Sequence, residues 1–427
     1  MNETARNLEQ HVRILTELGV RLAGSSAEQR AAAYLRDAFL RYVPDVSIEE
    51  FPVRERCVAS EKLEIRIGDS WQEFPCSSFG LAPSTGGRIR EADIVFFDAA
   101  TGYQRPDLSF LTAKAVVHLG CHIESNENYR RLMAAAPAFL LFVDTRYTGE
   151  SPLADGLFPA YVRKYGAVPS LNVAYMDAWK WKTAHAARAR ISVGGSLRES
   201  TTTVVVCELP GTEPDSGIIF AGGHHDTQAG TVGADDNAIG SAAVVELARL
   251  LSVRPHRRTC RLISFGAEEQ LSQGSAGYVR SHCREIKRNG VFMCNFDSMG
   301  SALGWAEFTV NGSVGLRKLI AETYHAHGVY YTELVKPSPY SDQFPFATCG
   351  VPGIWLFRRN CDSGIFYHHR ADNTPDKLDF DVSAQLVEAS AVLLGTLADQ
   401  EDISPYRGMP ADLQREIASL YTSVYDF

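Results

Sequence analysis

Acid and imidazole side chains gather at five short stretches in the second half of this 427-residue chain. Four of these stretches directly follow apolar runs that we expect to be strands. Histidine nitrogens and carboxylate oxygens bind divalent metals, and a carboxylate beside a metal can take a proton from water. The sequence therefore predicts a hydrolytic metal site built from these loops. The stretches are residues 223–226 (GHHD), 233–237 (GADDN), 265–269 (FGAEE), 295–297 (NFD) and 367–370 (YHHR).

Each stretch alone also has an ordinary structural explanation. Asp236 or Asn237 would cap a helix beginning near Ala238, the acid pair 268–269 would complement a helix dipole, and Asp297 would form a turn. A count of charge favours the metal interpretation. Two divalent ions bring four positive charges, which three carboxylates and one hydroxide nearly neutralise, with two neutral histidines as further donors. This mixed donor set predicts two Zn²⁺ ions, with Co²⁺ or Mn²⁺ as substitutes.

The five stretches, in this order and spacing, resemble the signatures of the M28 zinc aminopeptidases. Residues 15–25 (LTELGVRLAGS) and 208–214 (ELPGTEP) are also similar to the family, so the resemblance covers nearly the whole chain. It implies that one aspartate bridges the two metals and that the peptide bond after it is commonly cis. The roles it implies are Asp235 as the bridge, His224 and Asp297 on one ion, Glu269 and His369 on the other, Glu268 as general base, and Asp226 as the acid that orients His224.

Two parts of the resemblance depart from the family pattern or are less specific. Many members have Thr after the ligand histidine and Asp where this chain has Asn373, whereas Arg370 follows the histidine pair here. An ungapped count back from residues 378–379 gives His369 as the ligand, and a count from Asp372 gives His368. We expect His369. Tyr340 and Asp342 correspond to the rim of the substrate pocket.

The resemblance implies hydrolysis of peptides with a free N-terminus and release of their N-terminal residues. A dipeptidase, a carboxypeptidase or a single-zinc glutaminyl cyclase on the same scaffold are alternatives within enzymology. A non-catalytic, receptor-like homologue is the alternative of another class, and the retained ligands and base argue against it.

The elements that must position these loops follow an alternating pattern from residue 201 onward. Continuous apolar runs predict strands at 217–221, 261–265, 291–296 and 353–357, and amphipathic stretches predict helices at 238–252, 275–283, 316–327 and 382–398. Such alternation predicts an α/β three-layer sandwich with a largely parallel central sheet. The loops after neighbouring parallel strands meet at one edge of the sheet. Upstream, Ser26 and Gln29 predict a capping box for a helix, and residues 404–427 predict an extra surface helix.

Residues 52–197 differ in character from their surroundings. Short β-rich runs alternate there with Gly, Pro and Ser turns, with one helix expected at 127–136. We therefore expect a catalytic domain formed by 1–51 and 198–427, with a mostly β domain inserted at 52–197. The insert is similar to a protease-associated domain, which in relatives sits beside the cleft as a lid or partner-binding module.

Composition excludes some classes of partner and does not fix the oligomeric state. The net charge of −9 argues against a nucleic-acid or anionic-membrane partner. No uninterrupted apolar stretch approaches the roughly 18 residues of a membrane span. Nine cysteines without a C-x-x-C pair predict reduced thiols and a cytoplasmic protein, although export after removal of a signal peptide stays open.

Overall fold

The computed structural model describes residues 1–147, 149–362 and 364–425. The chain forms two compact units, each described separately below. The first unit comprises Met1–Val53, Ser200–Thr227 and Thr231–Tyr421. The second comprises Arg54–Glu199, Gln228–Gly230 and the residues described after Tyr421.

The first unit is built on a mostly parallel sheet. Its strands lie in the order β13 (Tyr331–Val335), β12 (Trp305–Val310), β14 (Gly353–Arg359), β11 (Gly290–Phe296), β9 (Ile218–His224), β10 (Thr259–Phe265) and β8 (Arg188–Leu209). Strand β9 runs parallel to β10 and β11, β11 to β14, and β12 to β13, whereas β14–β12 and β10–β8 are antiparallel. Every residue of β9 and β10 is buried, as continuous apolar strands between two helical layers require.

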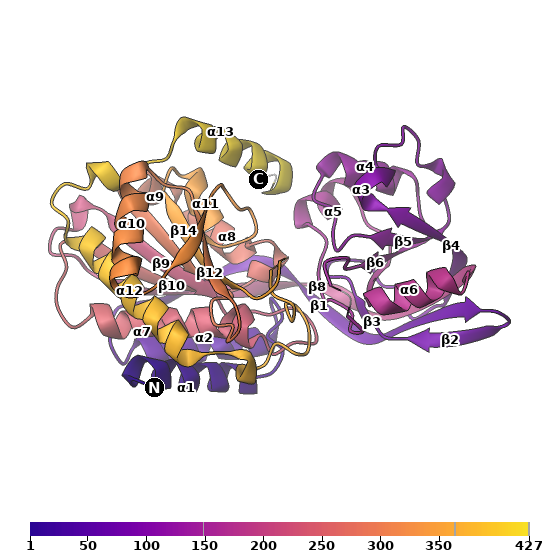
Figure 1. The fold of residues 1–427 in the computed structure, drawn as a ribbon, viewed down its shortest axis with the longest axis horizontal. Coiled ribbons are helices and arrows are strands. Elements are labelled where there is room, and N and C mark those ends of the chain that lie inside the picture. Colours follow the sequence, from indigo (N-terminus) through magenta and orange to yellow (C-terminus); the bar gives the residue numbers. More distant parts are fainter. Residues whose placement is uncertain (148, 363, 426–427) are drawn as a thin grey trace. The chain divides into compact units, whose positions relative to one another are not determined.

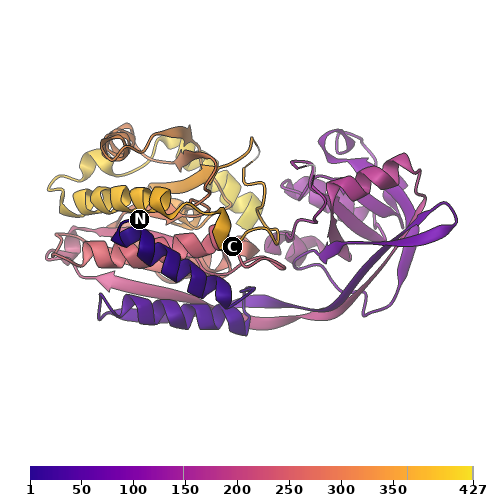
Figure 2. The ribbon, with the colours of Figure 1, turned by 60° about the horizontal axis from the view of Figure 1, so that its bottom comes forward.

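Helices cover both faces of this sheet (Figures 1 and 2). One layer holds α1 (Glu3–Glu17), α2 (Ser26–Phe39), α7 (Ile239–Leu251), α10 (Val314–Ala326) and α12 (Phe380–Asp399), whose apolar side chains share one core. The other holds α8 (Gln273–Ser281), α9 (Cys283–Asn289) and α11 (Gln343–Thr348), against which α13 (Ala411–Leu420) packs. The predicted three-layer α/β sandwich is therefore confirmed. Strands β12 and β13 were not predicted from the sequence.

Helix α12 is long and apolar enough to cross a membrane by length and composition alone, which holds for no other helix in the part of the chain that the structure describes. It packs against α1, α7 and α10, and 56% of its most apolar window is buried inside the protein. Its apolar composition is thus explained by the core it contributes to.

The N-terminus of α2 corrects one predicted detail. The capping residue is Ser25, not Ser26, and its side chain accepts a hydrogen bond from the amide of Glu28 at 3.2 Å. The Glu28 carboxylate accepts in return from the amide of Gly24 at 2.7 Å. Ser25 has the extended backbone that a cap requires, which a sequence with two adjacent serines does not reveal.

The second unit contains a smaller parallel sheet. Strands β4 (Arg90–Asp98), β5 (Ala115–Leu119), β6 (Phe139–Val143) and β7 (Ser170–Val173) are parallel neighbours, and β3 (Cys76–Ser78) joins β7 antiparallel. The predicted helix is α4 (Asn126–Ala134), but α3 (Ala99–Gly102), α5 (Pro159–Tyr165) and α6 (Tyr175–Thr183) were not predicted. Helices this short carry too few turns to show a clear period. Strands β8 and β1 (Val46–Ile67), the latter paired with β2 (Ser70–Phe74), contribute residues to both units.

Candidate metal centre

The carboxyl ends of three parallel strands bring the predicted loops together. The register of β9 and β10 pairs His224 with Phe265, the residue that precedes the loop to Glu268 and Glu269. Strand β11 pairs Asn295 with Gly222 on the other side of β9, which brings Asp297 level with His224. The predicted meeting of these loops at one edge of the sheet is therefore observed.

Three buried groups form a first cluster around His224. Its Nε2 atom lies 3.2 Å from Asp236 Oδ1 and 3.6 Å from Asp297 Oδ1. Each of the three residues offers a ligand atom within 4.8 Å of the other two. This geometry can hold a metal ion.

A second cluster uses the other oxygen of the same aspartate. Asp236 Oδ2 lies 3.1 Å from His368 Nε2 and 3.3 Å from His369 Nε2. His369 Nε2 also lies 2.9 Å from Glu269 Oε2. The two imidazole rings stack with centroids 3.5 Å apart. Asp236 is thus common to both clusters, and His369 is the histidine of the pair that lies against Glu269.

The shared carboxylate is therefore Asp236, and the prediction that Asp235 occupies this position is wrong. Both oxygens of Asp235 are engaged elsewhere: Oδ1 accepts from the Gly300 amide at 2.7 Å and Oδ2 from the Tyr367 hydroxyl at 3.1 Å. The Asp235 amide donates to Asn373 Oδ1 at 2.7 Å. Asp235 thus anchors neighbouring loops. The cis peptide bond is Asp236–Asn237, one residue later than the bond after Asp235.

Asp226 organises the acid pair that follows β10. Its carboxylate accepts from the amide of Glu268 at 3.0 Å and from the amide of Glu269 at 3.2 Å. Asp226 Oδ1 also lies 3.4 Å from His224 Nδ1. One buried carboxylate therefore contacts a residue of the first cluster and the backbone that carries Glu269 of the second.

Glu268 lies beside the clusters without belonging to either. Its Oε2 atom is 3.9 Å from His224 Nε2, and its Oε1 atom accepts from the Ser272 hydroxyl at 3.2 Å. Burial is the main cause that raises the pKa of Glu268 well above its usual range, with the charges of Asp342, Asp297 and Glu269 adding to it. A carboxyl held in this way can accept a proton near neutral pH.

The electrostatics of the site match a cation-binding role. Burial raises the pKa of Asp235, Glu269 and Asp342 to about 7 in each case, and the charges of neighbouring carboxylates add to the increase. Burial also acts on Asp236, but the close approach of His224, His368 and His369 lowers its pKa well below the usual range. Within the described residues, neither His224 Nε2 nor Asp236 Oδ2 makes a well-formed hydrogen bond. Buried imidazole nitrogens and carboxylate oxygens without a well-formed hydrogen bond are suited to bind divalent cations.

Arg21 is a site-supporting residue to which the sequence analysis assigned no role. Its side chain is fully buried and donates to the backbone carbonyls of His225 at 2.7 Å, Val232 at 2.8 Å and Leu15 at 3.1 Å. Its own amide donates to Thr227 Oγ1 at 2.9 Å. Arg21 therefore ties the loop after His224 to the loop before Asp236. The available signal was a single arginine inside the apolar run of residues 20–23.

The two residues expected at the substrate rim differ in exposure. Asp342 is fully buried at the start of α11, and neither of its oxygens has a hydrogen-bond partner of good geometry in the described part of the chain. Its charge raises the pKa of Glu268, so it lies near the clusters. Tyr340 is 36% exposed. Their contact with substrate stays a prediction.

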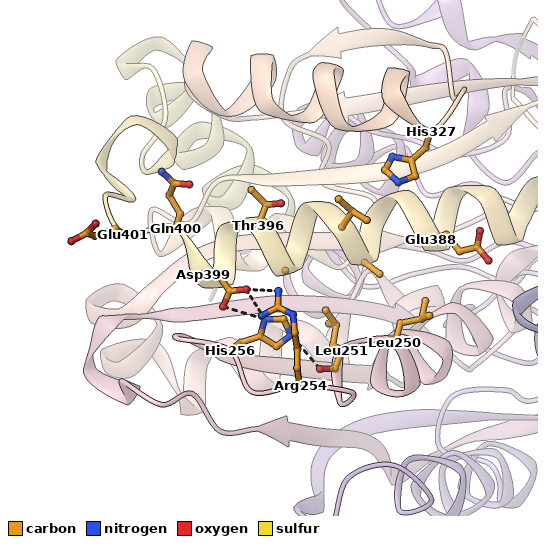
Figure 3. Close-up of a pocket in the computed structure, with 13 residues that line it drawn as sticks. Leu250, Leu251, Arg254, His256, His327, Glu388, Thr396, Asp399, Gln400 and Glu401 are labelled. Atoms are coloured by element: carbon orange, nitrogen blue, oxygen red, sulfur yellow. Dashed lines mark hydrogen bonds and ion pairs between the residues drawn. The ribbon is translucent and has the colours of Figure 1, made fainter.

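A separate surface pocket of about 750 Å³ lies along α12, away from these residues (Figure 3). Three of its side chains pair with one another: Asp399 lies 2.6 Å from Arg254 and 3.1 Å from His256. None of the five acid–imidazole stretches lines this pocket, and the acid–imidazole clusters remain the candidate site.

Comparison with known proteins finds a family match for the part of the chain that carries the candidate site. Residues 204–393, which include all five acid–imidazole stretches, match the model of peptidase family M28. Aminopeptidase YwaD of Bacillus subtilis is 22% identical over 371 residues, covering 83% of this chain and 76% of the relative. The structure of a peptidase M28 precursor from Shewanella amazonensis matches with a TM-score of 0.80 at 20% identity, covering 96% of this chain and 97% of its own.

The structure of BSAP, a zinc aminopeptidase from Bacillus subtilis, matches with a TM-score of 0.75 at 18% identity, covering 94% of this chain and 98% of its own. At this identity the structural matches establish the fold. The matched family region contains the loops that form both clusters. Residues 204–393 are therefore similar to peptidase family M28, and this match indicates a peptidase.

Proposed function

We propose that this chain is an aminopeptidase that holds two zinc ions and releases the N-terminal residue of peptides. His224, Asp236 and Asp297 would hold one ion, and Asp236, Glu269 and His369 the other. The observation that carries the proposal is the position of Asp236, whose two oxygens lie in separate clusters. Zinc supplies a Lewis acid that polarises a carbonyl and lowers the pKa of water.

The remaining chemistry belongs to the protein's own side chains. Glu268 takes the proton of the attacking water and returns it to the leaving amine, a role supported by its raised pKa and its place beside His224. Asp226 holds the backbone of Glu268 and Glu269 in place. The buried acidic groups, Asp342 among them, favour a positively charged group nearby. The α-ammonium group of a peptide is such a group, which supports cleavage from the N-terminal end.

The names of similar proteins support the choice of an aminopeptidase, because YwaD and BSAP are both named aminopeptidases. A carboxypeptidase or dipeptidase would use the same clusters on different peptide ends. A glutaminyl cyclase would need one zinc ion and a substrate with N-terminal glutamine.

The deciding experiment combines metal analysis with blocked substrates. Purified protein is assayed as isolated, after chelation and after zinc restoration, on aminoacyl-anilides, dipeptides, and one peptide in N-acetylated and C-amidated forms. We expect about two zinc ions per chain, activity that follows zinc, and cleavage of the amidated but not the acetylated peptide. Activity that ignores the chelator, or cleavage of only the acetylated peptide, contradicts the proposal. One zinc per chain with cyclisation of N-terminal glutamine replaces it by the cyclase.

A further inference from the structure

A separate group of reactive side chains, distinct from both acid–imidazole clusters, lies in the second unit after strand β5. The Cys121 Sγ atom is 3.1 Å from Nδ1 of His122. The other ring nitrogen of His122, Nε2, lies 3.2 Å from Glu124 Oε1. A thiol, an imidazole and a carboxylate therefore follow one another at hydrogen-bond distance, which is the arrangement of an activated nucleophile.

The direction of these hydrogen bonds follows from the carboxylate. An ionised Glu124 only accepts, so Nε2 of His122 carries a hydrogen and donates it. Nδ1 of the neutral ring is then an acceptor, and the Cys121 thiol is its donor. Transfer of that proton to Nδ1 gives a thiolate beside an imidazolium, and the thiolate is the reactive form of cysteine.

The charged groups around this pair come from both neighbouring loops. Asp155 Oδ2 lies 3.5 Å from His122 Nδ1 and favours the protonated ring. Arg146, in the loop after β6, lies near enough for its pKa to be affected by the charge of Cys121. Asp144 pairs with Arg146 at 2.9 Å, and the buried His118, whose pKa burial lowers to about 4, stays neutral. The pair thus has one neighbouring cation on the thiol side and two carboxylates on the imidazole side.

The position of the cluster suits a reactive site. The loops after β5 and β6 lie beyond the carboxyl ends of two adjacent parallel strands, which is where open α/β sheets bind ligands. Cys121 is partly exposed, whereas Cys207, Cys260 and Cys294 are buried. The Cys121 thiol therefore combines accessibility with an adjacent base.

We propose that Cys121 is a nucleophilic thiol that undergoes exchange with low-molecular-weight disulfides, with His122 as its base. The thiol proton moves to His122 Nδ1, and the sulfur attacks one sulfur of the disulfide. A new bond to Cys121 forms, the old disulfide bond breaks, and the departing thiolate takes the proton from His122. One thiol and one disulfide are consumed, and one mixed disulfide and one free thiol are formed.

The test treats the intact protein with glutathione disulfide near pH 7 and maps the adduct by peptide mass spectrometry. Cys361 serves as a partly exposed reference thiol in the same molecule. An ordinary thiol, with a pKa of about 8.5, is only a few per cent ionised at that pH, so we expect Cys121 to react roughly tenfold faster than Cys361. The variant His122→Gln, which removes the base, should bring Cys121 to the rate of Cys361 and leave the rate of Cys361 unchanged. Cys121→Ser should remove the fastest adduct.

A result in which Cys121 reacts no faster than Cys361, or in which His122→Gln keeps the wild-type rate, overturns the proposal. If the variant does not fold, the pH dependence of iodoacetamide alkylation of wild-type Cys121 decides the matter. We expect half-maximal reactivity clearly below about pH 8.5, the value for an unassisted thiol, and a midpoint at or above it rejects the assignment. Peptidase activity should be the same in Cys121→Ser and wild type.

Discussion

Replacing Arg21 by methionine should damage the metal centre from a distance. The methionine fills much of the same volume but donates no hydrogen bond. It leaves the carbonyls of His225, Val232 and Leu15 without their buried donor. Because Arg21 joins the loop after His224 to the loop before Asp236, both the stability of the first unit and the spacing of the ligands should change.

The size of the effect follows from those contacts. A hydrogen bond to a charged group contributes about 1.5–3 kcal/mol, and part of the loss is recovered because the methionine avoids burying a cation. We expect a net loss of about 3–5 kcal/mol in the free energy of unfolding. At roughly 2 °C per kcal/mol for a unit of this size, the melting temperature should fall by about 6–10 °C. Zinc affinity should fall by about 10–100-fold, as for other residues that support ligands.

The assay is calorimetry of the zinc-free protein together with zinc titration against a competing chelator. Arg13→Met is the matched control, because Arg13 has a side chain 58% exposed and pairs with Glu9 on the surface of α1. That control should change stability by less than about 0.5 kcal/mol. If Arg21→Met lowers the melting temperature no more than Arg13→Met, or leaves zinc affinity unchanged, the positioning role is refuted.

Three further predictions concern individual side chains. Asp236→Asn should abolish binding of both of the zinc ions that we propose, whereas Asp235→Asn should weaken it by about 10–100-fold; equal effects, measured as zinc content after dialysis, would contradict the geometry. Glu268→Gln should lower kcat by about 10²–10⁴-fold with zinc content unchanged, and a variant that loses zinc instead would make Glu268 a ligand. Burial, aided by the charge of Arg41, lowers the pKa of His11 to about 4. Between about pH 6.5 and pH 4, the unfolded chain therefore carries a proton on this histidine that the folded chain does not. Stability should therefore fall with pH, by about 2 kcal/mol near pH 5, and urea unfolding of His11→Gln at pH 7 and 5 should lack that loss.

The central elements and the membership of the site were accessible from the sequence. Strands β9, β10 and β11 are buried on both faces, so each is a continuous apolar run, and such a run predicts a strand from composition alone. Parallel strands end at one edge of a sheet, so the loops after them had to meet. Strands β12 and β13 lie toward the sheet's edge, where a half-exposed pattern such as that of β13 is less distinctive.

Which of two adjacent residues performs a role was decided only by the tertiary structure. Asp235 and Asp236 have the same side chain and neighbouring positions, so composition and spacing treat them alike. The fold places Gly300 and Tyr367 against Asp235 and the histidines against Asp236. The cap at Ser25 was settled in the same way by backbone conformation.

Arg21 shows the same division most clearly. Residue types and the local hydrophobic period are enough to recognise Arg21 as a cation, the acid–imidazole loops as candidate ligands, and the apolar runs before these loops as strands. Contacts between residues 21 and 225, or 21 and 232, join segments about two hundred positions apart. No local pattern encodes such contacts, because they arise only when helices and strands pack around a common core.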